Sequence, residues 1–252
     1  MKYIASCSFG KDSLAQIIVA REMGEPLDGA IYCEVMYTDE ISGEIPEHHD
    51  FIYNVAIPKL EREYGVKTEV IRSDITMKDD FYRLFERGKN AGKLYGYPTP
   101  MGCHINRDCK MRAIKAWKRS QTEPITQYVG IAADEPKRLE RMKDGTVSIL
   151  AKYGITEEMA TEICRERGLL SPIYSFSKRN GCWFCPNMNK NELLNLYYNH
   201  RDLWDDLAFM QDTPNLAYPF WHRGKTLYDV EATLTTPKSI EQFREMQQQR
   251  KI

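Results

Sequence analysis

The 252-residue chain contains no apolar run that approaches the roughly 18 residues of a membrane-spanning helix, so no membrane partner is expected. It also has almost no net charge, because 35 basic residues face 36 acidic ones. No global field would draw a nucleic acid or an anionic membrane, and any site for a polyanion has to be a local patch. The sequence begins directly on a strand-like run and shows no signal-peptide pattern. These absences predict a cytoplasmic protein.

Cysteine is present, but not in a form that suggests disulfides. In a reducing compartment seven cysteines are better explained as core thiols, metal ligands or catalytic groups. The last of them in this sequence is Cys185.

Apolar strand-like runs alternate with helical stretches over the first part of the chain, which is the pattern of a parallel sheet with crossover helices. The expected strands are 2–8, 30–37, 67–71 and 125–131, and the expected helices are 47–64, 78–89 and 107–119. The predicted class is α/β, with a doubly wound, mostly parallel five-stranded sheet. From about residue 150 short helices and aromatic-rich segments replace the alternation. This change predicts a nucleotide-binding domain at 1–150 and a smaller helical, cysteine-containing substrate lobe at 151–252.

The most informative segment lies between the first strand and a run of good helix formers, and it reads Ser8, Phe9, Gly10, Lys11, Asp12, Ser13. A tight loop at this place directs backbone N–H groups and the positive end of a helix dipole at one point. Gly10 is expected to let the backbone turn and approach a ligand, Lys11 adds a charge, and the two serines add hydroxyl groups. The loop therefore predicts a phosphate site, against the alternative of an ordinary strand–turn–helix junction.

This loop is not a Walker A motif. That motif needs a glycine five residues before its Gly-Lys pair and a serine or threonine directly after the lysine, where this chain has Ala5 and Asp12. The order Ser-x-Gly-Lys-Asp-Ser instead resembles the PP-loop of the ATP pyrophosphatases. That superfamily also contains the proteins similar to phosphoadenylyl-sulfate (PAPS) reductase.

Two later loops strengthen the resemblance, which covers about residues 1–140. Thr38-Asp39 and the following Glu44-Ile45-Pro46-Glu47 are similar to the turn and helix start after the second strand of PAPS reductase-like proteins. The segment from Gly130 to Arg138 is similar to their Gly-Ile-Arg-Ala-Asp-Glu-Ser element, with Ala132 in place of its arginine. Arg138 or Arg141 would have to compensate.

The resemblance implies a nucleotide site formed by three loops, which are expected to converge beyond the carboxyl ends of the strands. Besides the PP-loop, its implied residues are Thr38, Asp39, Gly130, Asp134, Glu135 and Arg138. Asp39 would meet a ribose, a Mg ion or polar groups of the adenine. The alternative at both later loops is a capped helix with solvated acids.

Four cysteines form two pairs. Cys182 and Cys185 have the tight spacing with which two thiolates grip one metal, whereas Cys103 and Cys109 are a looser pair. Together they predict a joint site for Zn or a 4Fe-4S cluster, with His104 as a substitute ligand. The remaining cysteines are predicted to be small core residues: Cys7, Cys33 and Cys164.

Two basic segments are candidate anion sites. The stretch 107–119 carries six cations around Trp117, and 221–226 reads Trp-His-Arg-Gly-Lys-Thr. Either one is a patch for a phosphorylated substrate or an RNA backbone, or it is a solvated polar surface.

The leading functional hypothesis is an ATP-dependent PP-loop enzyme in which Lys11, Asp12 and Asp39 are catalytic and Mg assists. An acceptor oxygen would attack the α-phosphorus and release pyrophosphate, and a sulfur or nitrogen nucleophile would then displace AMP. The resemblance implies tRNA or DNA as substrate and a cysteine desulfurase or other sulfur donor as partner. A homodimer is also expected.

Two other functions stay open. One is PAPS or APS reduction, against which stand the Lys11-Asp12 pair and the lack of a cysteine after Cys185. The other is a non-catalytic, metal-stabilised nucleotide-binding module. This function is favoured by Ala132, which stands where the similar family element has an arginine.

Overall fold

The computed structural model describes residues 1–99 and 102–249. The chain forms two compact units, and each is built from three segments. Unit 1 contains 1–34, 45–72 and 113–174, and unit 2 contains 35–44, 73–112 and 175–252. This division differs from the predicted one at residue 150, because the chain enters unit 2 twice before that point. The last three residues of the predicted lobe 151–252 lie outside the described residues.

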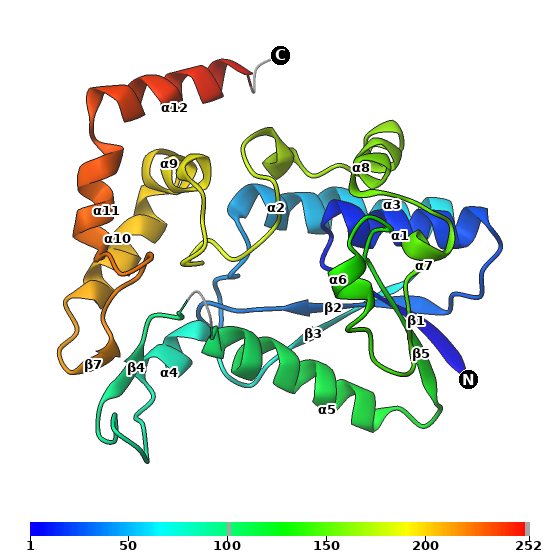
Figure 1. Cartoon of the computed structure of the whole chain (residues 1–252), viewed down its shortest axis with the longest axis horizontal. Helices are drawn as coiled ribbons and strands as arrows, with labels where there is room; N and C mark the ends of the chain where they lie inside the picture. The colour runs from blue at the N-terminus through cyan, green and yellow to red at the C-terminus, as the bar shows by residue number, and fades with distance from the viewer. Residues whose placement is uncertain (100–101, 250–252) are drawn as a thin grey trace. The chain divides into compact units, whose positions relative to one another are not determined.

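Unit 1 is built on a five-stranded parallel sheet, which confirms the predicted fold class (Figure 1). The strand order is β3-β2-β1-β5-β6. The strands are β1 (Lys2–Ser6), β2 (Gly29–Glu34), β3 (Thr68–Arg72), β5 (Ile125–Val129) and β6 (Thr146–Val147). Four of them lie where the apolar runs predicted them. The short β6 has too few residues to show as such a run.

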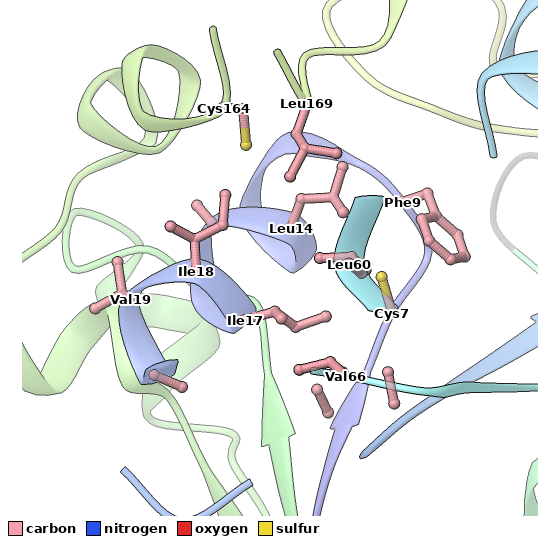
Figure 2. Close-up of a cluster of buried hydrophobic side chains, with 14 of the residues drawn as sticks. Cys7, Phe9, Leu14, Ile17, Ile18, Val19, Leu60, Val66, Cys164 and Leu169 are labelled. Atoms are coloured by element: carbon pink, nitrogen blue, oxygen red, sulfur yellow. The ribbon is translucent and has the colours of Figure 1, made fainter. Parts of the chain in front are cut away.

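Helices cover both faces of this sheet. In Figure 1, α1 (Lys11–Glu22) and α3 (Ile57–Tyr64) lie on one side of it and α5 (Arg112–Ser120) on the other. Eight consecutive residues of α1, from Ser13 to Ala20, are buried. A helix that is buried all round must have neighbours on every side. One side of α1 faces the sheet, and α8 (Glu157–Glu166) contributes to the cluster from another (Figure 2).

The predicted helix 47–64 is present, but its middle part is a π-helix, whose turns are wider than those of an α-helix. It runs through α2 (Pro46–Phe51), the π-helix η1 (Ile52–Ala56) and α3 without a break. Pro58 explains the π turn, because proline has no N–H to donate and its ring would clash with the carbonyl four residues earlier in an α-helix.

Unit 2 is mostly helical around a small parallel pair of strands, β4 (Leu94–Gly96) and β7 (Leu216–Tyr218). Its helices are α4 (Met77–Tyr82), the π-helix η2 (Asn106–Met111), α9 (Lys190–Asn199), α10 (Arg201–Gln211), α11 (Leu227–Leu234) and α12 (Pro237–Gln249). The helix expected at 78–89 is thus shorter than predicted. The core of unit 2 contains the three largest fully buried side chains of the described residues, Trp183, Trp204 and Trp221. No described helix is long and apolar enough to span a membrane.

The burial of α1 gives a direct test of the core. Ile18 is fully buried in the cluster, so Ile18→Ala should lower the free energy of unfolding by about 2–5 kcal/mol. Met159→Ala, which removes a side chain that is 45% exposed, should cost much less. Urea unfolding of the two variants checks the difference, and equal losses would contradict this account of the core.

Candidate functional site: the loop after β1 and the cysteine knuckle

The loop between β1 and α1 makes its turn at Phe9, whose φ is +57°. Gly10, which was predicted to let the backbone turn and approach a ligand, has a φ of −73° and serves as the N-cap of α1, and its approach to a ligand stays a prediction. Phe9 is fully buried, and its ring meets Tyr32 of β2 edge-on at 5.1 Å between centroids. A left-handed residue of this size is uncommon, and burial of its ring holds it in that conformation.

Ser13 closes the loop from inside. Its hydroxyl donates to the Gly10 carbonyl (2.9 Å) and accepts from the Ser8 N–H (3.2 Å). The Ser8 hydroxyl lies 3.4 Å from it. Ser13 is buried, so its hydroxyl shapes the loop and does not extend from it.

A buried histidine supports the loop from outside. His48 of α2 has its Nε2 3.3 Å from the Ser8 carbonyl and its Nδ1 2.9 Å from the Ser171 hydroxyl. The side chain is fully buried, and this burial lowers the pKa of His48 to about 4. His48 is therefore neutral at pH 7. No sequence pattern indicates this role, because a single histidine at a helix start has no distinctive spacing.

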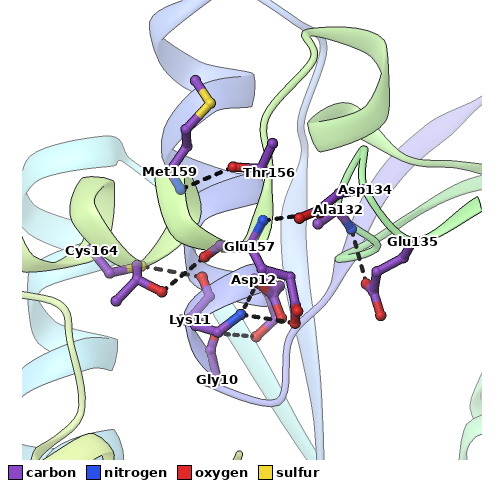
Figure 3. Close-up of polar contacts among 12 residues, drawn as sticks. Gly10, Lys11, Asp12, Ala132, Asp134, Glu135, Thr156, Glu157, Met159 and Cys164 are labelled. Atoms are coloured by element: carbon purple, nitrogen blue, oxygen red, sulfur yellow. Dashed lines mark hydrogen bonds and ion pairs between the residues drawn. The ribbon is translucent and has the colours of Figure 1, made fainter. Parts of the chain in front are cut away.

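Lys11 lies at the first position of α1 and is held by two carboxylates (Figure 3). Its Nζ is 2.7 Å from Asp12 and 3.1 Å from Glu157 of α8. Burial by itself would lower the pKa of Lys11, but the two carboxylates outweigh it and the pKa is raised. For Asp12, burial dominates and raises the pKa despite Lys11. The Lys11 N–H donates to the Tyr174 hydroxyl at 2.9 Å.

Gly130, at the end of β5, touches the start of α1. A Cβ placed there would lie 2.8 Å from the Asp12 carbonyl carbon and from the Ser13 nitrogen. Backbone atoms cannot give way at this distance, so only glycine fits. Gly130 thus belongs to the site by close approach of the backbone.

The acidic residues after β5 are engaged in local structure. Asp134 accepts from the Glu157 N–H at 3.1 Å, next to the start of α8 (Figure 3). Glu135 pairs with Arg138 at 2.6 Å and accepts from the Ala132 N–H at 3.1 Å. Unit 1 therefore brings the loop 8–13 and the predicted segment 130–138 together around α1 and α8. Their predicted contacts with a nucleotide stay a prediction.

Thr38 and Asp39 belong to unit 2. The Thr38 hydroxyl accepts from the Ile41 N–H at 3.0 Å and closes a short turn, and Asp39 is exposed on that turn. Their predicted role beside Lys11 stays a prediction as well.

The same segment of unit 2 packs on the cysteine knuckle 140 residues later. Glu44 pairs with Cys182 in an isolated antiparallel bridge, and the Trp183 N–H donates to the Gly43 carbonyl at 2.9 Å. A Cβ on Gly43 would lie 2.6 Å from the Val35 carbonyl and 2.9 Å from the Phe184 ring, so glycine is required there. Sequence patterns gave no sign of this pairing.

The two cysteines of the knuckle lie in a tight turn, in which the Cys185 N–H donates to the Cys182 carbonyl at 3.0 Å. The pKa of Cys182 is raised well above its usual value by burial, by Glu44 and by the neighbouring thiol of Cys185. A thiolate at Cys182 is thus disfavoured unless a cation compensates for it. Arg179 Nη2 lies 3.4 Å from the Cys185 sulfur.

The looser pair is divided between two environments. Cys103 is exposed, and its sulfur accepts from the Asn106 N–H at 3.4 Å. Cys109 lies in η2, fully buried, and its thiol is 3.5 Å from the Thr76 carbonyl. Burial raises the pKa of Cys109 to about 12. Cys109 is in this respect a core thiol.

His104 is oriented as metal-binding histidines often are. Its Nδ1 lies 2.5 Å from the fully buried Asp80 carboxylate, and its Nε2 is buried without a hydrogen-bond partner among residues 1–99 and 102–249. A carboxylate that holds one ring nitrogen leaves the other for a metal. However, within the described parts of the chain no three Cys, His, Asp or Glu side chains are grouped closely enough to hold a metal ion. The donor types fit a metal, but the four-cysteine site is not assembled, and it stays a prediction.

The other cysteines and the first basic segment have structural roles. Cys7, Cys33 and Cys164 are buried, which confirms the prediction of core thiols. In the stretch 107–119, Arg107 pairs with Asp108 at 2.6 Å and Arg112 with Asp74 at 3.3 Å. The packed position of Trp117, 8% exposed, favours a solvated helix face over a nucleic-acid patch.

Comparisons with known proteins add little. No family model matches the chain. No curated protein matches it either. Among solved structures, the chain is similar to the U34-tRNA thiolase NcsA from Methanococcus maripaludis, which was solved with its 4Fe-4S cluster. That similarity has a TM-score of 0.41 and 17% identity over 83% of this chain and 67% of the other. A likeness this distant says nothing about function, which has to be inferred from the residues of this chain.

The environment of His48 predicts how stability depends on pH. A neutral histidine with a pKa of about 4 in the folded state regains its ordinary pKa of about 6.5 on unfolding. The unfolded chain therefore binds more protons in this window, and stability should fall by up to about 3 kcal/mol from pH 6.5 to pH 4.

The matched variant is His48→Gln, because glutamine offers a donor and an acceptor without titrating. Urea unfolding at several pH values should give a shallower slope for this variant than for the wild type. Parallel slopes would contradict the assignment of a neutral, buried His48.

Proposed function

We propose that the chain is a PP-loop enzyme that cleaves ATP at the α-phosphorus and releases pyrophosphate. The observation that carries the proposal is Lys11 at the N-terminus of α1, next to a loop that is held from several sides and follows the first strand of a parallel sheet. Backbone N–H groups and the helix dipole favour phosphate at such a place. A rigid anion site with a mobile cation is what the transfer of an adenylyl group requires.

In this proposal Lys11 exchanges partners. Without ATP its ammonium group is neutralised by Asp12 and Glu157. The Glu157 side chain is 52% exposed, so the lysine can leave it for a phosphate oxygen at small cost. Lys11 would then stabilise the negative charge that builds on pyrophosphate as the bond between the α-phosphorus and the bridging oxygen breaks.

The remaining roles follow from the resemblance to the PP-loop family. Asp12 would be catalytic, Asp39 would meet a ribose, a Mg ion or polar groups of the adenine, and Mg would neutralise the phosphates. Thr38, Asp134, Glu135 and Arg138 would contact the nucleotide. The acceptor would be a nucleic acid or nucleobase, and a sulfur or nitrogen nucleophile would displace AMP from it. A sulfur donor such as a cysteine desulfurase, a homodimer and a cytoplasmic location complete the proposal.

PAPS or APS reduction is the second candidate, favoured by the loops at 38–47 and 130–138. The Lys11-Asp12 pair and the lack of a cysteine beyond Cys185 speak against it. The third candidate, a non-catalytic nucleotide-binding module, would bind ATP without releasing pyrophosphate.

The cysteines are proposed to hold Zn or a 4Fe-4S cluster. The knuckle of Cys182 and Cys185 would supply two ligands, Cys103 and Cys109 the others, and His104 would be a substitute. Thiolates fit both groups, and either would remove the penalty that burial imposes on a charged Cys182. A cluster would handle sulfur, whereas Zn would order the substrate lobe.

Lys11→Ala should reduce the release of pyrophosphate from ATP about 10²–10³-fold, because it removes the only side-chain cation placed at the start of α1 among the described residues. The measurement is pyrophosphate and AMP formed with Mg, with and without bulk tRNA or DNA. Lys152→Ala, an exposed lysine of unit 1, is the control. Release at the wild-type rate by Lys11→Ala would refute the proposal, and formation of sulfite from PAPS with reduced thioredoxin as the electron donor would favour the reductase.

Metal content tests the cysteine proposal. Protein purified without oxygen should contain Zn or iron, and Cys182→Ser/Cys185→Ser should lose it. Elemental analysis gives the metal per chain, and visible absorption identifies an Fe–S cluster. Cys33→Ala, a change at a buried core thiol, should keep the metal. A metal-free wild type, or a double variant that retains its metal, would contradict the assignment.

A further inference from the structure

Unit 2 contains a cavity of about 340 Å³ that is lined by both basic and apolar residues. Its apolar lining residues are Met188, Leu193 and Val230. The basic groups that line it are Lys190, His222, Arg223 and Lys225, and no carboxylate lines it. None of the three permanent cations forms an ion pair within 1–99 and 102–249, although the Lys190 ammonium donates to the Thr233 carbonyl at 2.8 Å. The acids closest to them in the sequence have other partners: Glu192 accepts from the Asn189 N–H, and Asp229 accepts from the Thr226 N–H and hydroxyl at the start of α11.

Three of these basic residues are held by one tight turn. The His222 and Lys225 backbones exchange hydrogen bonds of 3.1 and 2.9 Å. The two residues between them have positive φ, +49° for Arg223 and +80° for Gly224. This is the two-residue hairpin turn, in which glycine is common but arginine is rare. An arginine in this uncommon conformation points to a requirement for its side chain at this place.

His222 adds a buried polar atom that has no partner. Its Nδ1 lies inside the protein and forms no hydrogen bond in the described parts of the chain. An unpaired buried nitrogen costs free energy unless a ligand or water satisfies it. Burial, Arg223 and Lys225 lower the pKa of His222, whereas a backbone hydrogen bond at Pro186 raises it, and a bound anion would raise it further.

The cavity is attached to the cysteine knuckle. Trp221, fully buried, donates its indole N–H to the Phe184 carbonyl at 3.0 Å, and Phe184 lies between Cys182 and Cys185 in the sequence. Met188 follows the knuckle directly, and its N–H lies 3.3 Å from the Cys185 carbonyl. A ligand in the cavity would therefore be held within the same rigid part of unit 2 as the two thiols.

From these observations we infer that the cavity binds a nucleotide, with its phosphate on Arg223, Lys225 and Lys190 and its base against the apolar lining residues. The combination of cations that form no ion pair with apolar side chains fits a phosphate joined to an aromatic ring better than it fits either group alone. The nucleotide is either a residue of a nucleic-acid strand or a free nucleotide. If the proposed reaction is correct, this nucleotide belongs to its substrate, and in that respect the inference rests on the proposed function. Binding of the nucleotide to the cavity does not itself require ATP.

The test is the binding of a short fluorescent single-stranded RNA to the full chain without ATP, with unlabelled tRNA and uridine monophosphate as competitors. Arg223→Asn/Lys225→Gln should bind the RNA at least about tenfold more weakly, because asparagine keeps the left-handed turn while both charges are lost. The slope of log affinity against log salt should fall by about 1.4 for two lost phosphate contacts to a single strand.

The control is Lys238→Gln/Arg244→Gln, which removes two exposed cations of α12 and should leave the affinity within about twofold of the wild type. Competition by uridine monophosphate identifies a free nucleotide as sufficient, and competition by tRNA alone identifies a strand. Equal losses in both double variants, or wild-type binding by Arg223→Asn/Lys225→Gln, would overturn the inference. Binding of a phosphopeptide in place of RNA would also overturn it.

The two proposals fail separately. Lys11→Ala should bind RNA as the wild type does, because Lys11 belongs to unit 1. If that variant also releases pyrophosphate normally, the proposed reaction is wrong and the nucleotide site stands. If pyrophosphate release depends on Lys11 but the RNA affinity is unchanged in Arg223→Asn/Lys225→Gln, only the inference about the cavity is wrong.

Discussion

The burial of α1 on all sides is the constraint on which the candidate phosphate site depends. Its residues from Ser13 to Ala20 are all buried. The helix therefore cannot shift along its axis without breaking packed contacts. The first turn of α1 is therefore fixed at the end of β1. Gly130 and Ser13 then set the loop around it, one through close backbone contact and the other through hydrogen bonds. Rigidity at this place is what allows the helix dipole to act on a ligand without reorganisation.

Asp12 and Glu157 compensate the charge of Lys11 at the start of α1. A half-buried ammonium group needs compensation, and the two carboxylates provide it. Glu157 comes from α8, which is held near the loop by Asp134 and by packing against α1. The acidic residues after β5 thus help to position the lysine. Positioning Lys11 is a different role from direct contact with a nucleotide, and the same residues can have both roles.

Unit 2 has its own organising contact, between the segment 42–44 and the cysteine knuckle. Glycine at position 43 allows the Val35 carbonyl and the Phe184 ring to approach within distances that a Cβ would prevent. The knuckle in turn supports Trp221 and the hairpin turn that follows it. The thiols, the unpaired His104 nitrogen and the basic cavity are therefore parts of one packed unit. The proposed metal site and the proposed nucleotide site would thus both belong to unit 2.

The sequence by itself determined the α/β class, four strands of the sheet, the loop 8–13 and the three core cysteines. These features depend on local patterns: apolar runs, helix-start residues and spacing of one residue type. The tertiary structure alone decided that Phe9 and not Gly10 takes the left-handed conformation, that His48 holds Ser8, and that 35–44 joins the cysteine knuckle. Each of these depends on contacts between residues far apart in the chain. A local sequence pattern does not show which distant residues a segment will contact. The interleaved units have the same cause, because the chain leaves unit 1 after β2 and again after β3, and only packing shows where those segments belong.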